Sequence, residues 1–475
     1  MSTGPIRRTS RVVEGSCWTC RRRRIKCDLE KPACERCRQN EQLCNYGSVP
    51  PFKWVGGIAS RGKNAPSDRT DSLELASPLS IPVSSPASIL MSPRASAQLD
   101  TECMLLYFSQ AVLPRFHLLE GAPRLDLSLL MQDKPLKQAI LAVSQTHFDL
   151  AHVMSTSVTL TRQQARSAAI RSLRNQLELG VKSANTAQNV FMINVLLCIL
   201  DGMIEPSNDH LGVTKWHLQG GHAMLTRWPS LPTDIIAKNG LHTHLLSCFA
   251  TMDLFHALLS GDKPFFDPLL WHMFAHTDSW WGNLPANDRF LGILKCYAEM
   301  ASLGSLVASS LPTRVGLQLV EKCLPAIEAT LLAPPHHGEA LVTDGVVTPE
   351  NWAIFCELYE LCGIIYLQRA LRLLPIDDPA VQAAVKEGVG KLTDGSLPGM
   401  MAHCVVLPLL VLGAHALSPD DQTVILRTIM PSISYLSFGN LQLMADSLRD
   451  IWRTDDKTGT WWDAFQALSA KAFLF

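Results

Sequence analysis

Apolar residues recur at the spacing of an amphipathic helix along most of the chain after about residue 100. In the clearest example, the helical stripe follows Asp133, a residue type that favours helix N-termini. Its members are Leu136, Ala139, Ile140, Val143, His147 and Leu150. Few segments alternate between apolar and polar residues, as a strand would. The pattern predicts a large all-α domain over residues 101–475.

Two further segments show how the predicted helices begin and end. Ala165, Ala169, Leu173 and Leu177 form another stripe, and Gly180 follows it as a stop signal. A long helix is expected to open at Thr348-Pro349 and to continue through Leu374, where Pro375 closes it. Short breaks rich in Pro, Gly and Asp separate such segments, as in an array of packed helices.

The residues before this domain follow no helical or alternating period. Residues 49–100 are rich in Ser, Pro and Ala, which is typical of a flexible, disordered linker. No sustained heptad occurs between residues 45 and 100, so a coiled-coil dimerisation element is not expected there. The chain therefore divides into a small domain over residues 12–48, a linker over 49–100 and the helical domain.

The small domain contains two cysteine triplets on one repeated spacing. The triplets are Cys17, Cys20, Cys27 and Cys34, Cys37, Cys44. A Cys-x-x-Cys pair can grip one zinc ion from the same side. Two tetrahedral zinc ions need more ligand positions than the sulfurs can fill if each sulfur binds only one ion. The requirement is met if two of the cysteines each bridge both ions.

A disulfide framework and ordinary cysteines are the alternatives to zinc. The remaining cysteines are scattered, mostly in apolar runs, as free thiols are in a reducing compartment. No histidine precedes His117, so the first domain offers no histidine ligand. The spacing therefore predicts zinc bound by sulfur.

The charge distribution separates the small domain from the rest. Residues 1–63 carry 14 Lys and Arg against 5 Asp and Glu, whereas the remainder carries 28 against 38. The run Arg21-Arg22-Arg23-Arg24-Ile25-Lys26 lies between the second and third cysteines, and the second triplet is more balanced. Alone, such a run fits a solvated face or a nuclear-import signal equally well. Beside a zinc cluster, its surplus charge favours contact with nucleic acid phosphates.

The segment from Cys17 to Cys44, with its basic run and the Lys31-Pro32 turn, resembles the fungal six-cysteine binuclear zinc cluster DNA-binding domain. The resemblance implies two Zn²⁺ ions bridged by Cys17 and Cys34. It also implies a helix after Cys20 that enters the major groove of double-stranded DNA and reads a CGG-type triplet.

By position, the resemblance assigns base contacts to Arg23 and Arg24, and contacts with phosphates to Arg21, Arg22 and Lys26. Many relatives have lysine at one or both of the base-reading positions. An arginine can contact guanine through two hydrogen bonds, but this departure leaves the preferred base sequence open.

The helical domain resembles the fungal-specific transcription factor regulatory domain, on segments such as TKWHLQGGHAMLTRW at residues 214–228. The two resemblances imply a nuclear regulator of RNA polymerase II transcription whose partners are DNA and the transcription machinery or co-regulators. The resemblances do not decide whether the protein forms a homodimer or which genes it controls. Members of the family control metabolic and secondary-metabolite gene clusters, among other targets. The alternative is a helical interaction scaffold whose cluster binds nucleic acid without sequence preference.

Neither a membrane anchor nor an enzyme is expected. The most apolar stretch, residues 404–417, is too short to span a bilayer and contains a proline. No GxSxG or GxGxxG motif occurs, and the GVGK segment at 388–391 has leucine where a phosphate-binding loop needs Ser or Thr.

Overall fold

The computed structural model describes residues 16, 17, 20, 25–31, 33–40, 44, 101–118, 133–152, 158–181, 183–206, 212–309, 313–332, 347–394, 397–454 and 458–475. They fall into two compact units, one before and one after the boundary between residues 82 and 83. The linker predicted over residues 49–100, and the expected lack of a coiled coil there, lie outside the described residues.

The first unit is built around its cysteines. Helix α2 (Glu35–Arg38) starts directly after Cys34, and it is the helix that the structure describes in this unit. The small core consists of Cys17, Cys20, Cys27, Cys34 and Cys37, with Ile25 and Cys44 packed against it. Sulfur atoms thus take the place of the aliphatic side chains that hold larger domains together.

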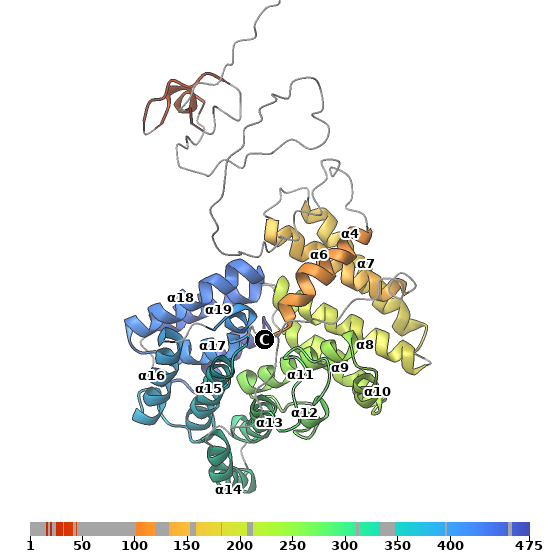
Figure 1. Ribbon diagram of the computed structural model, residues 1–475, viewed down its shortest axis with the longest axis vertical. Coiled ribbons are helices and arrows are strands. Elements are labelled where there is room, and N and C mark those ends of the chain that lie inside the picture. Colours follow the sequence, from red (N-terminus) through yellow and green to blue (C-terminus); the bar gives the residue numbers. More distant parts are fainter. Residues whose placement is uncertain are drawn as a thin grey trace, which may run out of the picture. The chain divides into compact units, whose positions relative to one another are not determined.

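The second unit is an array of packed helices (Figure 1), as the apolar periodicity predicts. Its α-helices are α4 (Thr101–Tyr107), α6 (Lys134–His152), α7 (Val158–Glu178), α8 (Ala184–Ile199), α9 (Val213–Arg227), α10 (Leu231–Lys238), α11 (Leu241–Ser260), α12 (Leu270–Met273), α13 (Arg289–Ala308), α14 (Arg314–Leu331), α15 (Pro349–Tyr366), α16 (Pro379–Asp394), α17 (Val406–His415), α18 (Pro419–Leu436), α19 (Gly439–Arg453) and α20 (Trp461–Ser469). Short π-helical and 3₁₀ segments extend or join some of them: η2 (Phe108–Val112), η3 (Leu113–Phe116), η4 (Leu200–Ile204), η5 (Leu367–Leu371) and η6 (Gly399–His403). Among the described residues there is no strand, and one isolated bridge pairs Ser279 with Gly282.

Helices α8 and α11 contribute many residues to the core: 12 of the 16 residues of α8 and 17 of the 20 residues of α11 are buried. Two segments, Ala184–Ile204 and Arg289–Ala308, are long and apolar enough to cross a membrane by length and composition alone. Their most apolar windows are 94% and 61% buried inside the protein, which is typical of core helices in an all-α domain.

The predicted helix starts are confirmed at two caps. The Leu136 backbone N–H donates to Asp133 Oδ1 at 3.0 Å, and the Asn351 N–H donates to the Thr348 hydroxyl at 3.3 Å. The predicted end of the third helix is wrong by three residues. Helix α15 passes into η5, which ends at Leu371, and Leu373 has φ at 56°, a left-handed conformation that a right-handed helix cannot continue through.

The stripe on α7 is confirmed in part. Ala169 is fully buried, but Leu177 is 52% exposed, so the last turn of α7 projects beyond its neighbours. Gly180 ends this region with φ at 74°, a conformation that glycine adopts without strain.

Candidate metal centre

The cysteine sulfurs of the first unit form two overlapping groups of four. One group is Cys17, Cys20, Cys27 and Cys34, and the other is Cys17, Cys34, Cys37 and Cys44. Within each group the sulfur atoms all lie within 4.8 Å of one another. Cys17 and Cys34 belong to both groups, so each group could hold one metal ion while sharing two sulfurs.

The spacing between sulfurs fits tetrahedral zinc. A tetrahedral zinc ion with Zn–S bonds of about 2.3 Å places its ligand sulfurs about 3.8 Å apart. The Sγ atoms of Cys17 and Cys34 are 3.7 Å apart, those of Cys20 and Cys34 are 3.6 Å apart, and those of Cys17 and Cys37 are 3.7 Å apart. These distances are far longer than a disulfide bond of about 2.05 Å, and each described cysteine is a free thiol.

The protein surroundings alone do not favour ionised thiols throughout this cluster. Burial, followed by hydrogen bonding with neighbouring thiols, raises the pKa of the Cys20 and Cys37 side chains above the usual value. A divalent cation reverses this preference, because a coordinating thiol is deprotonated by the ion it binds. The donor set therefore fits zinc, which prefers thiolate sulfur among the common divalent ions.

Backbone N–H groups turn toward two of the sulfurs. The Cys20 N–H donates to the Cys17 sulfur at 3.4 Å, and the Cys34 N–H donates to the Cys44 sulfur at 3.3 Å. Such hydrogen bonds spread the negative charge that two Zn²⁺ ions leave on six thiolates, and they orient the ligands.

Asp28 joins the two halves of the cluster, and the cysteine spacing gives no hint of this role. Its Oδ1 accepts from the Glu30 and Glu35 N–H groups at 3.1 and 3.2 Å, and its Oδ2 accepts from the Arg36 N–H at 3.3 Å. Helix α2 has no side-chain cap from its own N-cap residue, Cys34. Asp28, which directly follows Cys27, therefore supplies the acceptors that the first turn of α2 needs.

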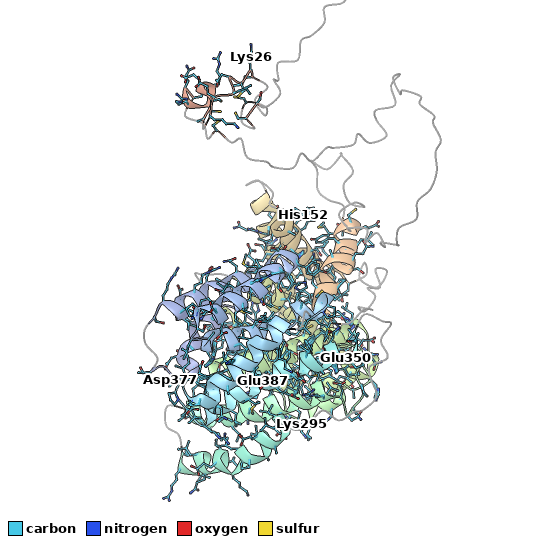
Figure 2. The ribbon with its side chains drawn as sticks, turned by 60° about the vertical axis from the view of Figure 1, so that its left-hand side comes forward. Lys26, His152, Lys295, Glu350, Asp377 and Glu387 are labelled. Atoms are coloured by element: carbon cyan, nitrogen blue, oxygen red, sulfur yellow. The ribbon has the colours of Figure 1, made fainter. Side chains whose placement is uncertain are left out.

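The second triplet uses much of its positive charge internally. The Arg38 guanidinium donates to Glu30 at 3.3 Å and to the Ala33 carbonyl at 3.0 Å, and it lies 3.2 Å from Glu35. Its charge is thus balanced within the unit, as the mixed composition of this triplet suggests. Lys26, in contrast, is exposed on the first half and is labelled in Figure 2.

The predicted base and phosphate contacts at Arg21, Arg22, Arg23 and Arg24 lie outside the described residues, as does Pro32. Lys26 is the member of the predicted DNA-binding set whose position is described. The structure therefore brings the six cysteines together, while the assignment of DNA contacts stays a prediction.

Comparisons with known proteins agree with this geometry. Residues 15–50 match the fungal Zn(2)-Cys(6) binuclear cluster domain, and residues 107–475 match the fungal specific transcription factor domain. No solved structure matches the chain.

Two curated relatives are similar over short regions. The agnestins biosynthesis cluster transcription factor of Paecilomyces divaricatus is 35% identical over 84 residues, which are 17% of this chain and 21% of that protein. An uncharacterized transcriptional regulatory protein of Schizosaccharomyces pombe is 36% identical over 78 residues, 16% of this chain and 14% of that protein. The similarity therefore spans about a fifth or less of either relative's length.

The expected fold, with a zinc cluster and a helical regulatory domain, is confirmed by the two domain matches and by the helical architecture. The paired groups of sulfurs and the matched cluster domain are consistent with a cofactor of two zinc ions. The chain belongs to the fungal Zn(2)-Cys(6) transcription factors.

Proposed function

We propose that the chain binds specific DNA sequences through a cluster in which Cys17 and Cys34 bridge two Zn²⁺ ions. Cys20 and Cys27 complete the coordination of one ion, and Cys37 and Cys44 complete that of the other. The observation that carries this assignment is the overlap of the two groups of sulfurs, since Cys17 and Cys34 are their shared members. When bound, the ions hold the loop and helix of each half in place.

The residues between Cys20 and Cys27 face the DNA. Arg23 and Arg24 contact base edges of a CGG-type triplet, because an arginine fork matches the O6 and N7 acceptors of guanine. Arg21, Arg22 and Lys26 contact phosphates and set the docking position. The exposed Lys26 and the internal pairing of Arg38 support the first half as the DNA-facing one.

The zinc cluster domain comprises residues 12–48, the linker residues 49–100 and the regulatory domain residues 101–475. The protein acts in the nucleus on genes transcribed by RNA polymerase II, and it acts by binding rather than by catalysis. Its helical domain contacts the transcription machinery or co-regulators.

The target genes belong to a secondary-metabolite biosynthesis cluster. The support is the relative from Paecilomyces divaricatus, which is named as the transcription factor of a biosynthesis cluster and is similar over 84 residues. Mapping the bound sites across the genome tests this assignment. Bound sites scattered among unrelated genes would contradict it.

A binding experiment with the zinc-loaded full chain tests sequence-specific recognition. Its affinity is measured for a duplex containing CGG triplets and for a scrambled duplex of the same composition, over a range of salt concentrations. Specific recognition predicts a preference for the CGG duplex that persists at each salt concentration. Equal affinity for both duplexes would favour the alternative of a helical scaffold whose cluster binds nucleic acid without sequence preference.

Single substitutions separate the proposed base and phosphate contacts. Replacement of Arg24 by Ala should relax the preference at one base step, by about 1–3 kcal/mol. Replacement of Lys26 by Ala should weaken binding to both duplexes alike and reduce the salt dependence. The exposed position of Lys26 makes this variant a matched control that leaves the core of the unit intact.

A further inference from the structure

The six cysteines of the first unit differ in how far solvent reaches them. Five of them are between 0% and 2% exposed. Cys44 is only partly buried, and it packs against the small core that the other five form. Among the six sulfur ligands, Cys44 is therefore the one that a small molecule can reach from solvent.

Cys44 also differs from the cysteines that the two groups of sulfurs share. It belongs to one group alone, together with Cys37 and the shared Cys17 and Cys34. Loss of the Cys44 sulfur leaves that group with three ligands, whereas the other group keeps all four. One metal position is thus open to attack, and the other is protected.

The chemistry of a metal-bound cysteine adds to this difference in exposure. A sulfur that coordinates zinc is a thiolate, because the ion displaces the thiol proton. The thiolate is the form that attacks oxidants, and access to the sulfur decides which cysteine reacts. Cys44 meets both conditions. Cys103 on α4 and Cys323 on α14 are also partly exposed, but neither belongs to a group of sulfurs among the described residues.

We propose that Cys44 is the site at which a peroxide oxidises the cluster, and that this modification releases one of the two zinc ions. The inference rests on the proposed two-zinc cluster and adds a way to regulate it. With hydrogen peroxide, the Cys44 sulfur attacks one oxygen, the O–O bond breaks, an S–O bond forms, and the other oxygen leaves as hydroxide. Cys44 becomes a sulfenic acid and is no longer a thiolate ligand.

The second step joins Cys44 to Cys37. Cys37 is the other sulfur that belongs to this group alone, so it loses its metal when the group loses Cys44, and the two sulfurs lie within 4.8 Å of each other. The Cys37 thiolate attacks the Cys44 sulfur, the S–O bond breaks, hydroxide leaves and a disulfide forms. Together the two steps convert two thiolates and one hydrogen peroxide into one disulfide and two hydroxide ions.

The oxidised chain should keep one ion. Cys17, Cys20, Cys27 and Cys34 remain as a complete group of four. The half with the basic run therefore stays metal-bound, while helix α2, which carries Cys37, is held by the disulfide instead.

The test treats the zinc-loaded full chain with hydrogen peroxide at increasing ratios to protein. Native mass spectrometry counts the bound zinc, and digestion after free thiols are blocked with iodoacetamide identifies the oxidised cysteines. Chains with one zinc ion and a Cys37–Cys44 disulfide are expected to accumulate. Cys44 should react at least about tenfold faster than any of the five buried ligands. Reduction with dithiothreitol in the presence of zinc should restore the second ion, since a disulfide is reversible.

Two variants of the full chain serve as controls. The double change Cys103→Ser with Cys323→Ser removes partly exposed thiols of the helical body and should leave zinc release unchanged. Cys44→His offers a zinc ligand without a thiol, and it should retain both ions at a peroxide ratio that removes one from the wild type. If Cys44→His does not bind two ions, the order of oxidation in the wild-type chain still decides.

Three results would overturn the proposal. One is oxidation of a buried ligand before Cys44, or of all six ligands at similar rates. Another is the simultaneous loss of both ions, because a shared sulfur, Cys17 or Cys34, would then be the one oxidised. The third is zinc release that disappears in the double variant of Cys103 and Cys323. Fewer than two ions in the untreated chain would contradict the proposed cluster itself, and this count is made before any peroxide is added.

Discussion

The Sγ atoms of Cys17 and Cys34 lie 3.7 Å apart, and they are the two sulfurs that both groups of four contain. This relationship makes the six cysteines unequal. A shared thiolate neutralises part of the charge of two ions, whereas an unshared thiolate serves one ion. Loss of a shared sulfur should therefore have larger consequences than loss of an unshared one.

Serine substitutions test this inequality. Cys17→Ser and Cys34→Ser should each lose both zinc ions, because each removes a ligand from both groups of sulfurs. Cys20→Ser should retain about one ion, since the group that contains Cys37 and Cys44 stays complete. Native mass spectrometry of the full chain during titration with a chelator counts the ions. An identical loss in all three variants would contradict the bridged arrangement.

Asp28 should control how long the cluster holds its zinc. Asp28→Ala removes the acceptor for three backbone N–H groups, which join the loop after Cys27 to helix α2. Zinc release to a chromogenic chelator should become about tenfold faster, as is common when groups behind the ligands are removed. Asp28→Asn keeps one acceptor oxygen and should give an intermediate rate.

Glu30→Ala is the matched control for Asp28. It removes an ion pair with Arg38 in which both side chains are about 60% exposed. Such exposed pairs contribute little to the stability of the folded state. Its zinc release should match the wild type. A rate as fast as that of Asp28→Ala would mean that any loss of charge near Cys27 has this effect, rather than the loss of the backbone acceptors.

The parts of the fold that the sequence predicts are those with a repeated pattern. Cysteine spacing identifies the metal centre, and apolar periodicity with a capping residue identifies α6 from Asp133 onward. The role of Asp28 cannot be predicted, because a single aspartate in a loop belongs to no repeated pattern. Its role also depends on α2 folding back toward it. The π turn at η5 is also missed, since the apolar run continues unchanged through it.

Long-range contacts are the other part that the sequence does not show. Trp461, the first residue of α20, is almost completely buried. Its partner is the Leu258 carbonyl on α11, which accepts from the Trp461 indole N–H at 2.8 Å. Because 203 residues separate the two, no local pattern could have paired them.

Two glycines within helices should respond in opposite ways to alanine. At Gly202 an added Cβ would overlap the Phe473 ring, and the Phe473 backbone N–H donates to the Gly202 carbonyl at 2.8 Å. Gly202→Ala should therefore lower the free energy of unfolding by about 1–3 kcal/mol. At Gly292 in α13 the added Cβ meets no atom within 4 Å, and alanine should stabilise the helix by about 0.5–1 kcal/mol.

Thermal unfolding of the full chain compares the two glycine variants, with the midpoint expected to fall for Gly202→Ala and to rise for Gly292→Ala. Equal midpoints would show that the Phe473 ring moves aside without any loss of folding stability. The last residues of the chain would then contribute little to the packing around η4.

The stability of the helical body should depend on pH through Asp288, the N-cap residue of α13. Burial raises the pKa of its carboxyl from 3.8 to about 6, although the backbone N–H groups of Phe290 and Leu291 favour the ionised form. A raised carboxyl pKa means that the folded state binds the proton more tightly than the unfolded state. The contribution of Asp288 is therefore fully present below about pH 4 and is lost as the pH rises to about 6.

Asp288→Asn removes this titration and keeps an acceptor for the Phe290 N–H, which donates to Asp288 Oδ1 at 2.7 Å. The variant should gain stability relative to the wild type between pH 4 and pH 7, by on the order of 2 kcal/mol. Glu350→Gln serves as a control of opposite sign. Backbone and Thr348 hydrogen bonds lower the pKa of the exposed Glu350, labelled in Figure 2, so its contribution is present at neutral pH and lost in acid. Unfolding midpoints are measured from about pH 3 to pH 7. Asp288→Asn should gain on the wild type as the pH rises above about 4, whereas Glu350→Gln should stay at a constant difference there and approach the wild type only below the usual glutamate pKa of 4.5. A curve for Asp288→Asn that runs parallel to the wild type would refute the role of Asp288.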